Sequence, residues 1–570
     1  MTQSVTRPAA APAGAAMTHR QVLESLSGLL LGMFVAILSS TVVANALPRI
    51  LADLKGTQSA YTWVVTATLL ATTATTPIWG KLADLTSKKI LVQLALVIFM
   101  LGSVLAGLSQ STGQLIACRV VQGVGAGGLT ALAQVIMAAM ISPRERGRYS
   151  GYLGAVMAVG TIGGPLIGGV IVDTSWLGWR WCFYVGIPFA IAAIAVLQKT
   201  LHLPVVTRKV KIDYLGATLI TGAVSALLIW VSLAGNNFAW LSWQTAALVG
   251  GAVLLGALAI RAESRAAEPI IPLRLFRNRT ITLSVLASIA VGLAMFGASV
   301  FLGQYFQISR GQSPTMSGLM TLPMILGLLV SSTVTGRLIS RTGRWKRYLV
   351  AGSILLTIGF GLMGTMRADT DFRLLSCYMA LIGLGLGMTM QNLVLAVQNT
   401  VGPHELGAAS SVVAFFRSLG GAVGVSALGA LLGHKVKDYL AEGLARLGIP
   451  ATSGGGTRIP DVHTLPAPIR AVVETAYGHA AGDVFLAAAP FGLIAILMVL
   501  LIKEVPLRQQ SGNELSAQVE RGAEVAAAAT APVVLEVGDG GARHEAPGRA
   551  AHHGDDGGRH EAPAGGRHTR

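Results

Sequence analysis

Two arginines lie far inside apolar stretches of the sequence, where a charged group is most able to do chemistry. Arg119 and Arg417 each have long runs of mostly apolar residues on both sides. A charge near the centre of a bilayer is costly, so it normally faces a water-filled cavity or a polar partner and marks a functional site. We therefore expect both guanidinium groups to serve an internal cavity, with a structural hydrogen-bonding hub as the alternative.

Amides spaced seven residues apart form a second polar set within one apolar stretch. Gln391 pairs in this way with Gln398, and Asn392 with Asn399. Seven residues are nearly two helical turns, so each pair shares one helix face. Such a face lines a cavity or bonds to another helix, and both interpretations stay open. Further candidates for a cavity wall are the polar residues of other apolar stretches: Gln122, Gln134, Gln304 and Tyr305.

The patterns of an enzyme or of an ATP-driven pump do not accompany these residues. The only Gly-Lys pair, at Gly80, lacks the earlier glycine of a phosphate-binding loop. A nucleophile elbow of the Gly-x-Ser-x-Gly type does not occur either. Cys118, Cys182 and Cys377 lie far apart in apolar runs and match neither a disulfide framework nor a metal site. We expect no enzymatic activity, no metal and no cofactor.

The composition indicates which elements must position these side chains. Of the 570 residues, 52% are hydrophobic and 12% are charged, whereas an ordinary soluble protein is about 25% charged. A helix that crosses a bilayer needs about 20 apolar residues, and the sequence contains fourteen such runs. We predict an all-α polytopic membrane protein with fourteen transmembrane helices. The net charge of +17 is spread over short loops rather than one basic face, so we expect no nucleic-acid partner.

Loop charge predicts the orientation. Every second loop carries a cluster of Lys and Arg, and the intervening short loops carry few, so the basic loops are expected to be cytoplasmic. An even number of helices then places both termini on the cytoplasmic side of the cell membrane. We expect disordered tails at 1–24 and 504–570, and an external loop at 434–481 with a short interfacial helix in "DYLAEGLARL".

An internal repeat relates the two halves of the chain. The segment "GKLADLTSKK" aligns with "GRLISRTGRW", so that Gly80 matches Gly336 and Lys88 matches Arg344. The segment "RVVQGVGAGG" aligns with "MALIGLGLGM" and keeps three glycines at a spacing of two. Equivalent membrane halves are typical of secondary transporters, whose substrate site lies between them.

The repeat offset of 256 to 260 residues also predicts the domain organisation. Six helices with short loops need fewer residues than this offset, so two further helices must lie between the halves. We expect a six-helix bundle at 25–200, two inserted helices at 213–261 and a second six-helix bundle at 280–503.

These segments resemble motifs of the major facilitator superfamily, in its fourteen-helix drug:proton antiporter branch. "GKLADLTSKK" resembles the loop motif between helices 2 and 3, and "RVVQGVGAGG" resembles the helix-4 motif with its buried arginine. "GTIGGPLIGG" resembles the helix-5 antiporter motif, whose positions here are Gly160, Gly164, Pro165, Gly168 and Gly169. Small residues let helices in lipid approach closely. We expect a bendable seam between the halves, with a static contact as the alternative.

The resemblance also implies roles for single residues. Asp84 would pair with basic residues and neighbouring helix ends to hold the cytoplasmic gate shut, with Arg146 and Lys88 as its candidate partners. An ordinary cap is the alternative. Arg119 would bridge to helix 1 and assist proton movement. The family pattern places an acid in helix 1 where this sequence has Ser39, and no Asp or Glu lies deep in the predicted spans. We therefore include Ser39 among the cavity residues and expect a neutral or anionic substrate.

Taken as a member of this family, the chain would be a monomeric secondary transporter that exports amphipathic drugs or antibiotics. The proton gradient would drive it without a cofactor, and the halves would expose a central site alternately to either side. Two alternatives stay open: an exporter of an endogenous lipid or secondary metabolite, and a non-transporting membrane scaffold or sensor.

Overall fold

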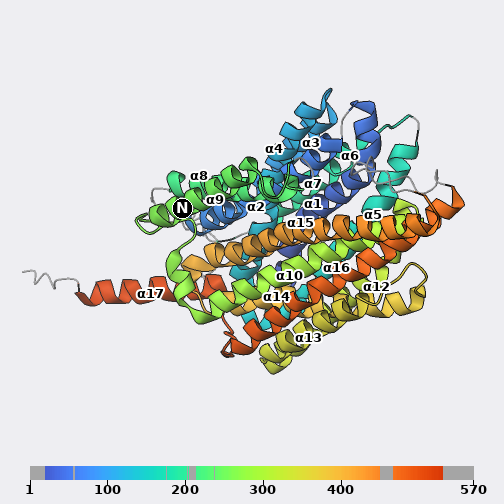
Figure 1. Cartoon of the computed structure of the whole chain (residues 1–570). Helices are drawn as coiled ribbons and strands as arrows, with labels where there is room; N and C mark the ends of the chain where they lie inside the picture. Colours follow the sequence, from blue (N-terminus) through green and yellow to red (C-terminus); the bar gives the residue numbers. More distant parts are fainter. Residues whose placement is uncertain are drawn as a thin grey trace, which may run out of the picture. The chain divides into compact units, whose positions relative to one another are not determined.

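A computed structural model describes residues 19–55, 58–174, 176–201, 203, 213–235, 238–449 and 466–530. The chain divides into two units, Met1–Glu520 and Arg521–Arg570, and the first unit holds every membrane-length helix described below. The described residues are folded into helices without a β-strand, which confirms the predicted all-α class (Figure 1). Residues 1–18 and 531–570 of the two predicted tails lie outside the described residues.

Short connections separate the helices of each half. The first half contains α1 His19–Asp53, α2 Gln58–Leu85, α3 Lys88–Gly107, α4 Thr112–Met140, α5 Pro143–Asp173, α6 Trp181–Tyr184 and α7 Ile187–Thr200. The second half contains η1 Leu273–Arg277, α10 Arg279–Gln304, η2 Tyr305–Ser309, α11 Pro314–Met320, α12 Leu322–Thr342, α13 Lys346–Met363, α14 Phe372–Gln398, η3 Pro403–Glu405, α15 Leu406–Arg446 and α16 Ala467–Leu501. Between the halves lie α8 Tyr214–Leu233 and α9 Trp243–Glu263, and α17 Gly512–Thr530 comes last.

Twelve helical segments of the described chain are long and apolar enough to cross a membrane. The helices α2, which carries many threonines, and α5 are not among these twelve. Both are nevertheless 28 and 31 residues long and pack along their neighbours. The twelve segments make this a multi-pass membrane protein, and fourteen crossings stay a prediction.

Local sequence explains where several helices begin and end. The side chains of Ser111, Asp213 and Ser242 accept hydrogen bonds from the first backbone N–H groups of α4, α8 and α9. Such caps satisfy donors that a helix cannot satisfy itself. Gly343 ends α12 with a φ of 70°, a left-handed conformation that glycine adopts without strain.

The halves repeat the same helix contacts. In the first half α1 packs on α5 and α7, while α2 and α3 pack on α4; in the second, α10 packs on α15 and α16, while α12 and α13 pack on α14. The glycines at a spacing of two explain the close packing of α4 and α14. A Cβ added at any of them would clash with a neighbouring helix: α2 at Gly123 and Gly127, α3 at Gly125, α12 at Gly383 and Gly387, α13 at Gly385.

The helix-5 motif does not line the seam, by which we mean the contact between the two halves. A Cβ at Gly164 would lie 2.0 Å from Thr41 Oγ1 of α1, and Thr41 Oγ1 donates to the Gly160 carbonyl at 3.0 Å. Gly168 also lies against α1. Because α1 belongs to the same half, the expectation of an inter-half seam at these glycines was wrong.

Gly169, the last glycine of the motif, lies near the second half instead. A Cβ added at Gly169 would lie 3.7 Å from Thr315 Oγ1 of α11, in the second half, which is an ordinary contact distance. The backbone of Pro165 lies inside α5, which continues to Asp173. The closest contacts of α5 with the other half come from its first turns, at Gly147, Gly151 and Gly154, before the motif.

The inserted helices lie beside the seam. They pack on each other, and α8 also contacts α2 of the first half and α15 of the second. In α9 only Ala259 and Glu263 are buried, so most of this helix faces away from the protein. The pair therefore adds a flank to both halves rather than a wall to the central site.

Three predicted boundaries need correction. Helix α1 begins at His19, inside the segment 1–24 that we expected to be disordered. The stretch "DYLAEGLARL" forms the last turns of α15, which continues to Arg446, instead of a separate interfacial helix. Residues 504–530 were expected to be disordered, yet Val505 and Arg508 bond to the bundle and residues 512–530 form α17.

The substitution Gly383→Ala is expected to destabilise the fold. The new Cβ would lie 1.9 Å from the Met324 carbonyl oxygen of α12, so the two backbones must separate. We expect a loss of about 1–3 kcal/mol in the free energy of unfolding, as for other overpacked sites, and a lower thermal midpoint in detergent. The control is Gly429→Ala in α15, where the Cβ meets open space. An equal or higher midpoint for Gly383→Ala than for this control would contradict the analysis.

Candidate functional site

The halves meet at one end of the bundle, which we call the basic end: the end that holds the loops after α2, α4, α9 and α12. A Cβ at Gly407 of α15 would lie 2.2 Å from the Gly80 carbonyl oxygen of α2. A Cβ at Gly147 of α5 would lie 2.1 Å from the Gly336 carbonyl oxygen of α12. Gly80 and Gly336 are equivalent in the repeat, so two matched glycine crossings join the halves.

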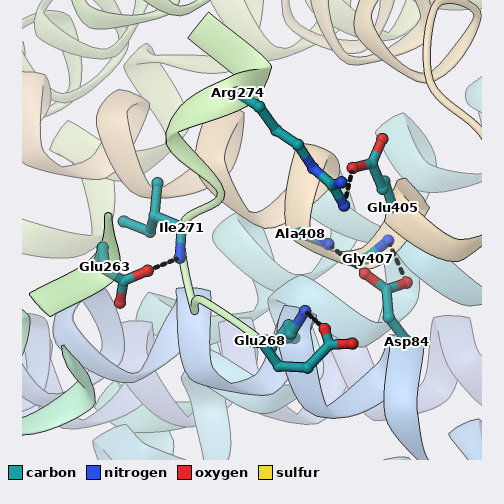
Figure 2. Close-up of polar contacts among 9 residues, drawn as sticks. Asp84, Glu263, Glu268, Ile271, Arg274, Glu405, Gly407 and Ala408 are labelled. Carbon is teal, nitrogen blue, oxygen red and sulfur yellow. Dashed lines mark hydrogen bonds and ion pairs between the residues drawn. The ribbon is translucent and has the colours of Figure 1, made fainter. Parts of the chain in front are cut away.

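Asp84 reinforces the first crossing. Its Oδ1 accepts a hydrogen bond from the Gly407 N–H at 2.7 Å, and its Oδ2 accepts one from the Ala408 N–H at 2.8 Å (Figure 2). These are among the first N–H groups of α15, which have no partner within their own helix and carry the positive end of its dipole. Asp84 therefore caps a helix of the other half, which combines the latch and cap interpretations.

The environment of Asp84 opposes its ionisation. Burial raises the pKa of Asp84 to about 7, although the two backbone hydrogen bonds and the charges of Lys88 and Lys81 lower it. Lys88 thus acts on Asp84 through its charge. This carboxyl group therefore titrates near neutral pH while it is held between the halves.

The hydrogen bonds of Arg146 go to groups other than Asp84, which was its expected partner. Its Nε and Nη2 donate to the Ile141 carbonyl at 3.1 Å, and Nη2 also donates to the Ala138 carbonyl at 3.1 Å. Its Nη1 donates to Gln398 Oε1 of α14, and Gln398 Nε2 donates to Ser410 Oγ of α15 at 2.6 Å. Arg146 is buried, and its guanidinium joins the first half to two helices of the second.

The amide side chains of α14 lie at the same contact between the two halves as Arg146. Gln134 Nε2 of α4 donates to Gln391 Oε1 at 3.3 Å, so Gln391 and Gln398 both bond across the seam. Asn392 donates back to its own helix, at the Met388 carbonyl. The three α14 side chains line a small cavity together with Arg146. The glutamines thus bond to other helices and also line a cavity, as the two interpretations proposed.

Arg119 organises a second polar cluster inside the first half. Its Nη1 donates to Gln122 Oε1 at 2.6 Å, and Gln122 Nε2 donates to Ser39 Oγ at 3.0 Å and Ser103 Oγ at 2.8 Å. The cluster connects α4 with α1 and α3, so the bridge to helix 1 runs through Gln122. Arg119 is 5% exposed and forms no ion pair with a described residue. Neutral dipoles alone surround its charge.

Four other predicted residues lie apart from these clusters. Arg417 of α15 is 9% exposed, and its guanidinium forms no hydrogen bond or ion pair within the described residues. Tyr305 Oη donates to the Arg367 carbonyl at the opposite end of the bundle, close in sequence to the half-buried Gln304. Their assignment to the cavity wall is not supported by these positions. Arg344 is exposed in the loop after α12.

Sequence reasoning missed two segments that fasten the basic end. In the segment between α9 and α10, Glu268 accepts from Lys81 Nζ of α2 at 2.6 Å, and Arg274 pairs with Glu405 at 2.6 Å (Figure 2). Residues 264–278, which we call the connecting segment, thus contact both halves. In the sequence, the only available signal of these contacts was an acidic residue within a stretch rich in arginine.

The second missed segment, residues 504–511, follows α16. Trp345 Nε1 donates to the Val505 carbonyl, and Asn399 Oδ1 accepts from the Arg508 N–H at 2.9 Å. The Arg508 carbonyl in turn accepts from the Arg144 N–H of the first half at 3.3 Å. This segment, which we call the strap, therefore also crosses the seam. Its backbone supplies the hydrogen-bond partners of Asn399, which faces away from the glutamines.

A multi-pass helical protein with two repeated halves, joined at one end by polar contacts that can be broken, has the architecture of a secondary transporter. The chain belongs to the Major Facilitator Superfamily, whose family model matches residues 29–425. Members of this family are transporters rather than enzymes.

Relatives and solved structures agree with this assignment. The chain is 39% identical over 512 residues to an uncharacterized MFS-type transporter of Mycobacterium tuberculosis, covering 89% of this chain and 73% of the relative. It is 36% identical over 420 residues to the multidrug transporter protein MdtP of Bacillus subtilis, covering 74% and 77%. The fold is similar to that of the proton:xylose symporter XylE, with a TM-score of 0.58, 14% identity and coverage of 88% and 100%.

The contact between Asp84 and α15 is expected to weaken as the pH rises. When the halves separate, the carboxyl returns to water and its pKa falls from about 7 toward its ordinary value of 3.8. The closed state then binds the proton more tightly than the open state. The stabilisation of the closed state by this proton is complete below pH 3.8 and is lost as the pH rises through about 7.

Spin labels at Thr86 and His404, in a chain without its native cysteines, would measure this effect. The mean distance should increase between about pH 5 and about pH 8. The control is Asp84→Asn, which cannot ionise at this position and should show a smaller change between the two pH values. Unchanged distances in the Asp84 protein would contradict the expected linkage.

Proposed function

We propose that this chain is a monomeric secondary transporter that exports amphipathic drugs or antibiotics in exchange for protons by alternating access. The observation that carries the proposal is the pair of matched glycine crossings at the basic end. Glycine contacts in lipid gain packing without interlocking side chains, so the crossings themselves can separate without side chains having to disengage. The efflux pumps and the multidrug transporter among the relatives support export as the direction.

The orientation follows from charge. Loops rich in Lys and Arg stay on the cytoplasmic side of a membrane, so the basic end would face the cytoplasm of a cell membrane with both termini on that side. The protein would then be closed toward the cytoplasm when Asp84 caps α15, and cytoplasmic substrates would enter after that contact opens.

The Arg119 cluster supports a neutral or anionic substrate. A buried cation that only neutral dipoles compensate attracts an anionic or strongly dipolar group and repels a cation. Ser39, which bonds to Gln122 in this cluster, supplies a hydroxyl where a carboxylate would have neutralised the charge. Arg417, buried without a bonded partner among the described residues, adds a second positive charge in the other half.

A second candidate is an exporter of an endogenous secondary metabolite. It is favoured by relatives such as the Acurin A biosynthesis cluster MFS-type transporter of Aspergillus aculeatus, 30% identical over 505 residues. The mechanism would be the same, and only a substrate screen separates the two candidates.

Inside-out membrane vesicles with an acidic interior test the function directly. We expect the vesicles to accumulate a drug or dye against its gradient and to lose it when an uncoupler is added. Asp84→Asn and Arg119→Ala should reduce the accumulation at equal protein levels, whereas the exposed Arg344→Ala should not. Accumulation no greater than in vesicles lacking the protein, across a broad substrate set, would leave the scaffold or sensor interpretation in its place.

The substitution Ser39→Asp should change the charge preference. A carboxylate next to Gln122 and Arg119 removes the net positive charge of the cluster, so a cationic dye would no longer be repelled. We expect transport of a quaternary ammonium dye, relative to a neutral substrate, to rise about tenfold, which corresponds to about 1.4 kcal/mol. Ser39→Asn is the size-matched control and should not change the ratio. Efficient transport of such dyes by the Ser39 protein would refute the preference.

A further inference from the structure

Two carboxyl groups meet where the inserted helices reach the basic end. Asp213 is the cap of α8, and its Oδ1 accepts from the Gly216 N–H at 2.8 Å. Glu263 is the last residue of α9, and its Oε2 accepts from the Ile271 N–H at 3.0 Å (Figure 2). Each carboxyl thus uses one oxygen to bind backbone.

The other oxygen of each group has no such partner. Asp213 Oδ2 and Glu263 Oε1 are both buried and form no hydrogen bond among the described residues. Both lie 2.4 Å from the position that a Cβ of residue 216 would occupy, so Gly216 provides the space in which they adjoin. Glu263 is 4% exposed. Two ionised carboxylates in this arrangement would repel each other without screening by water.

Neighbouring charges do not neutralise the pair. Lys81 of α2 acts on Glu263 through its charge, but its Nζ is already bound to Glu268 of the connecting segment. Helix α15, which also packs on α8, carries no charged side chain before Arg417, three turns from its start. Glu405 before α15 is paired with Arg274.

We propose that Asp213 and Glu263 form a proton-binding site that holds one proton between their two unpartnered oxygens. The proton comes from water, forms an O–H bond on one carboxyl, and is donated as a hydrogen bond to the oxygen of the other. The pair then carries a single negative charge and every carboxyl oxygen has a partner. Deprotonation returns the proton to water and leaves two repelling charges.

The place of the site suggests what the proton controls. Glu263 is followed directly by the connecting segment, and the segment contacts α2 through Glu268 and the second half through Arg274. Repulsion between the ionised carboxylates would displace the end of α9 and loosen these two contacts. This role rests on the proposed proton-driven transport, whereas the proton site itself does not.

Infrared difference spectroscopy of the full chain in lipid tests the site through the C=O stretch of a protonated carboxyl. An Asp84→Asn background removes the other carboxyl that titrates near neutral pH. We expect this background to retain a protonated carboxyl band at neutral pH and to lose it on alkaline titration. Adding Asp213→Asn or Glu263→Gln should remove the band at neutral pH, because the new amide donates to the remaining carboxylate and keeps it ionised.

Glu442→Gln is the control, since it removes an exposed carboxyl of α15 that is paired with Arg446, and its band should equal that of the background. Both amide variants keep their backbone hydrogen bonds, so either one suffices if the other misfolds. A band unchanged in both variants, or one that sodium ions displace at constant pH, would overturn the proposal. If the band behaves as expected but the vesicles show no proton-driven export, the proposed function fails and the site stands.

Discussion

Backbone contact between the halves depends on four glycines, Gly80 with Gly407 and Gly336 with Gly147. In lipid the hydrophobic effect does not press helices together, so close van der Waals packing and hydrogen bonds must do so. Glycine permits that approach without interlocking side chains. The other links at the basic end, from Asp84, Arg146 and the α14 glutamines, are placed by these crossings and would separate together with them.

The charges near the seam are compensated mainly by neutral groups. Asp84 binds backbone N–H groups, and Arg146 binds carbonyls and an amide. Arg119 is held by Gln122 alone among the side chains. Dipoles of this kind stabilise a buried charge without fixing it to an opposite charge. A substrate group or a proton can therefore compete for these sites, as a conformational cycle requires.

The inserted helices connect to the transport machinery only at its edge. Most of α9 faces away from the protein, while α8 touches both α2 and α15. Their strongest connection runs through the connecting segment, which has an ion pair to each half. Together with the strap after α16, it adds contacts that depend on neither repeat half alone. These are the parts of the protein where regulation can differ without changing the crossings.

The sequence by itself determined the helices, the repeat and the family motifs, because apolar run length, glycine spacing and helix caps are local properties that a short window reveals. It also located Arg119 and the α14 glutamines as polar groups in apolar surroundings, and Asp84 through its place in the loop motif. Only the tertiary structure decided their partners: α1 for the helix-5 glycines, Gln398 for Arg146, the start of α15 for Asp84. Those partners come from segments far away in the chain, and helix periodicity fixes the face of a residue but not the helix that covers it.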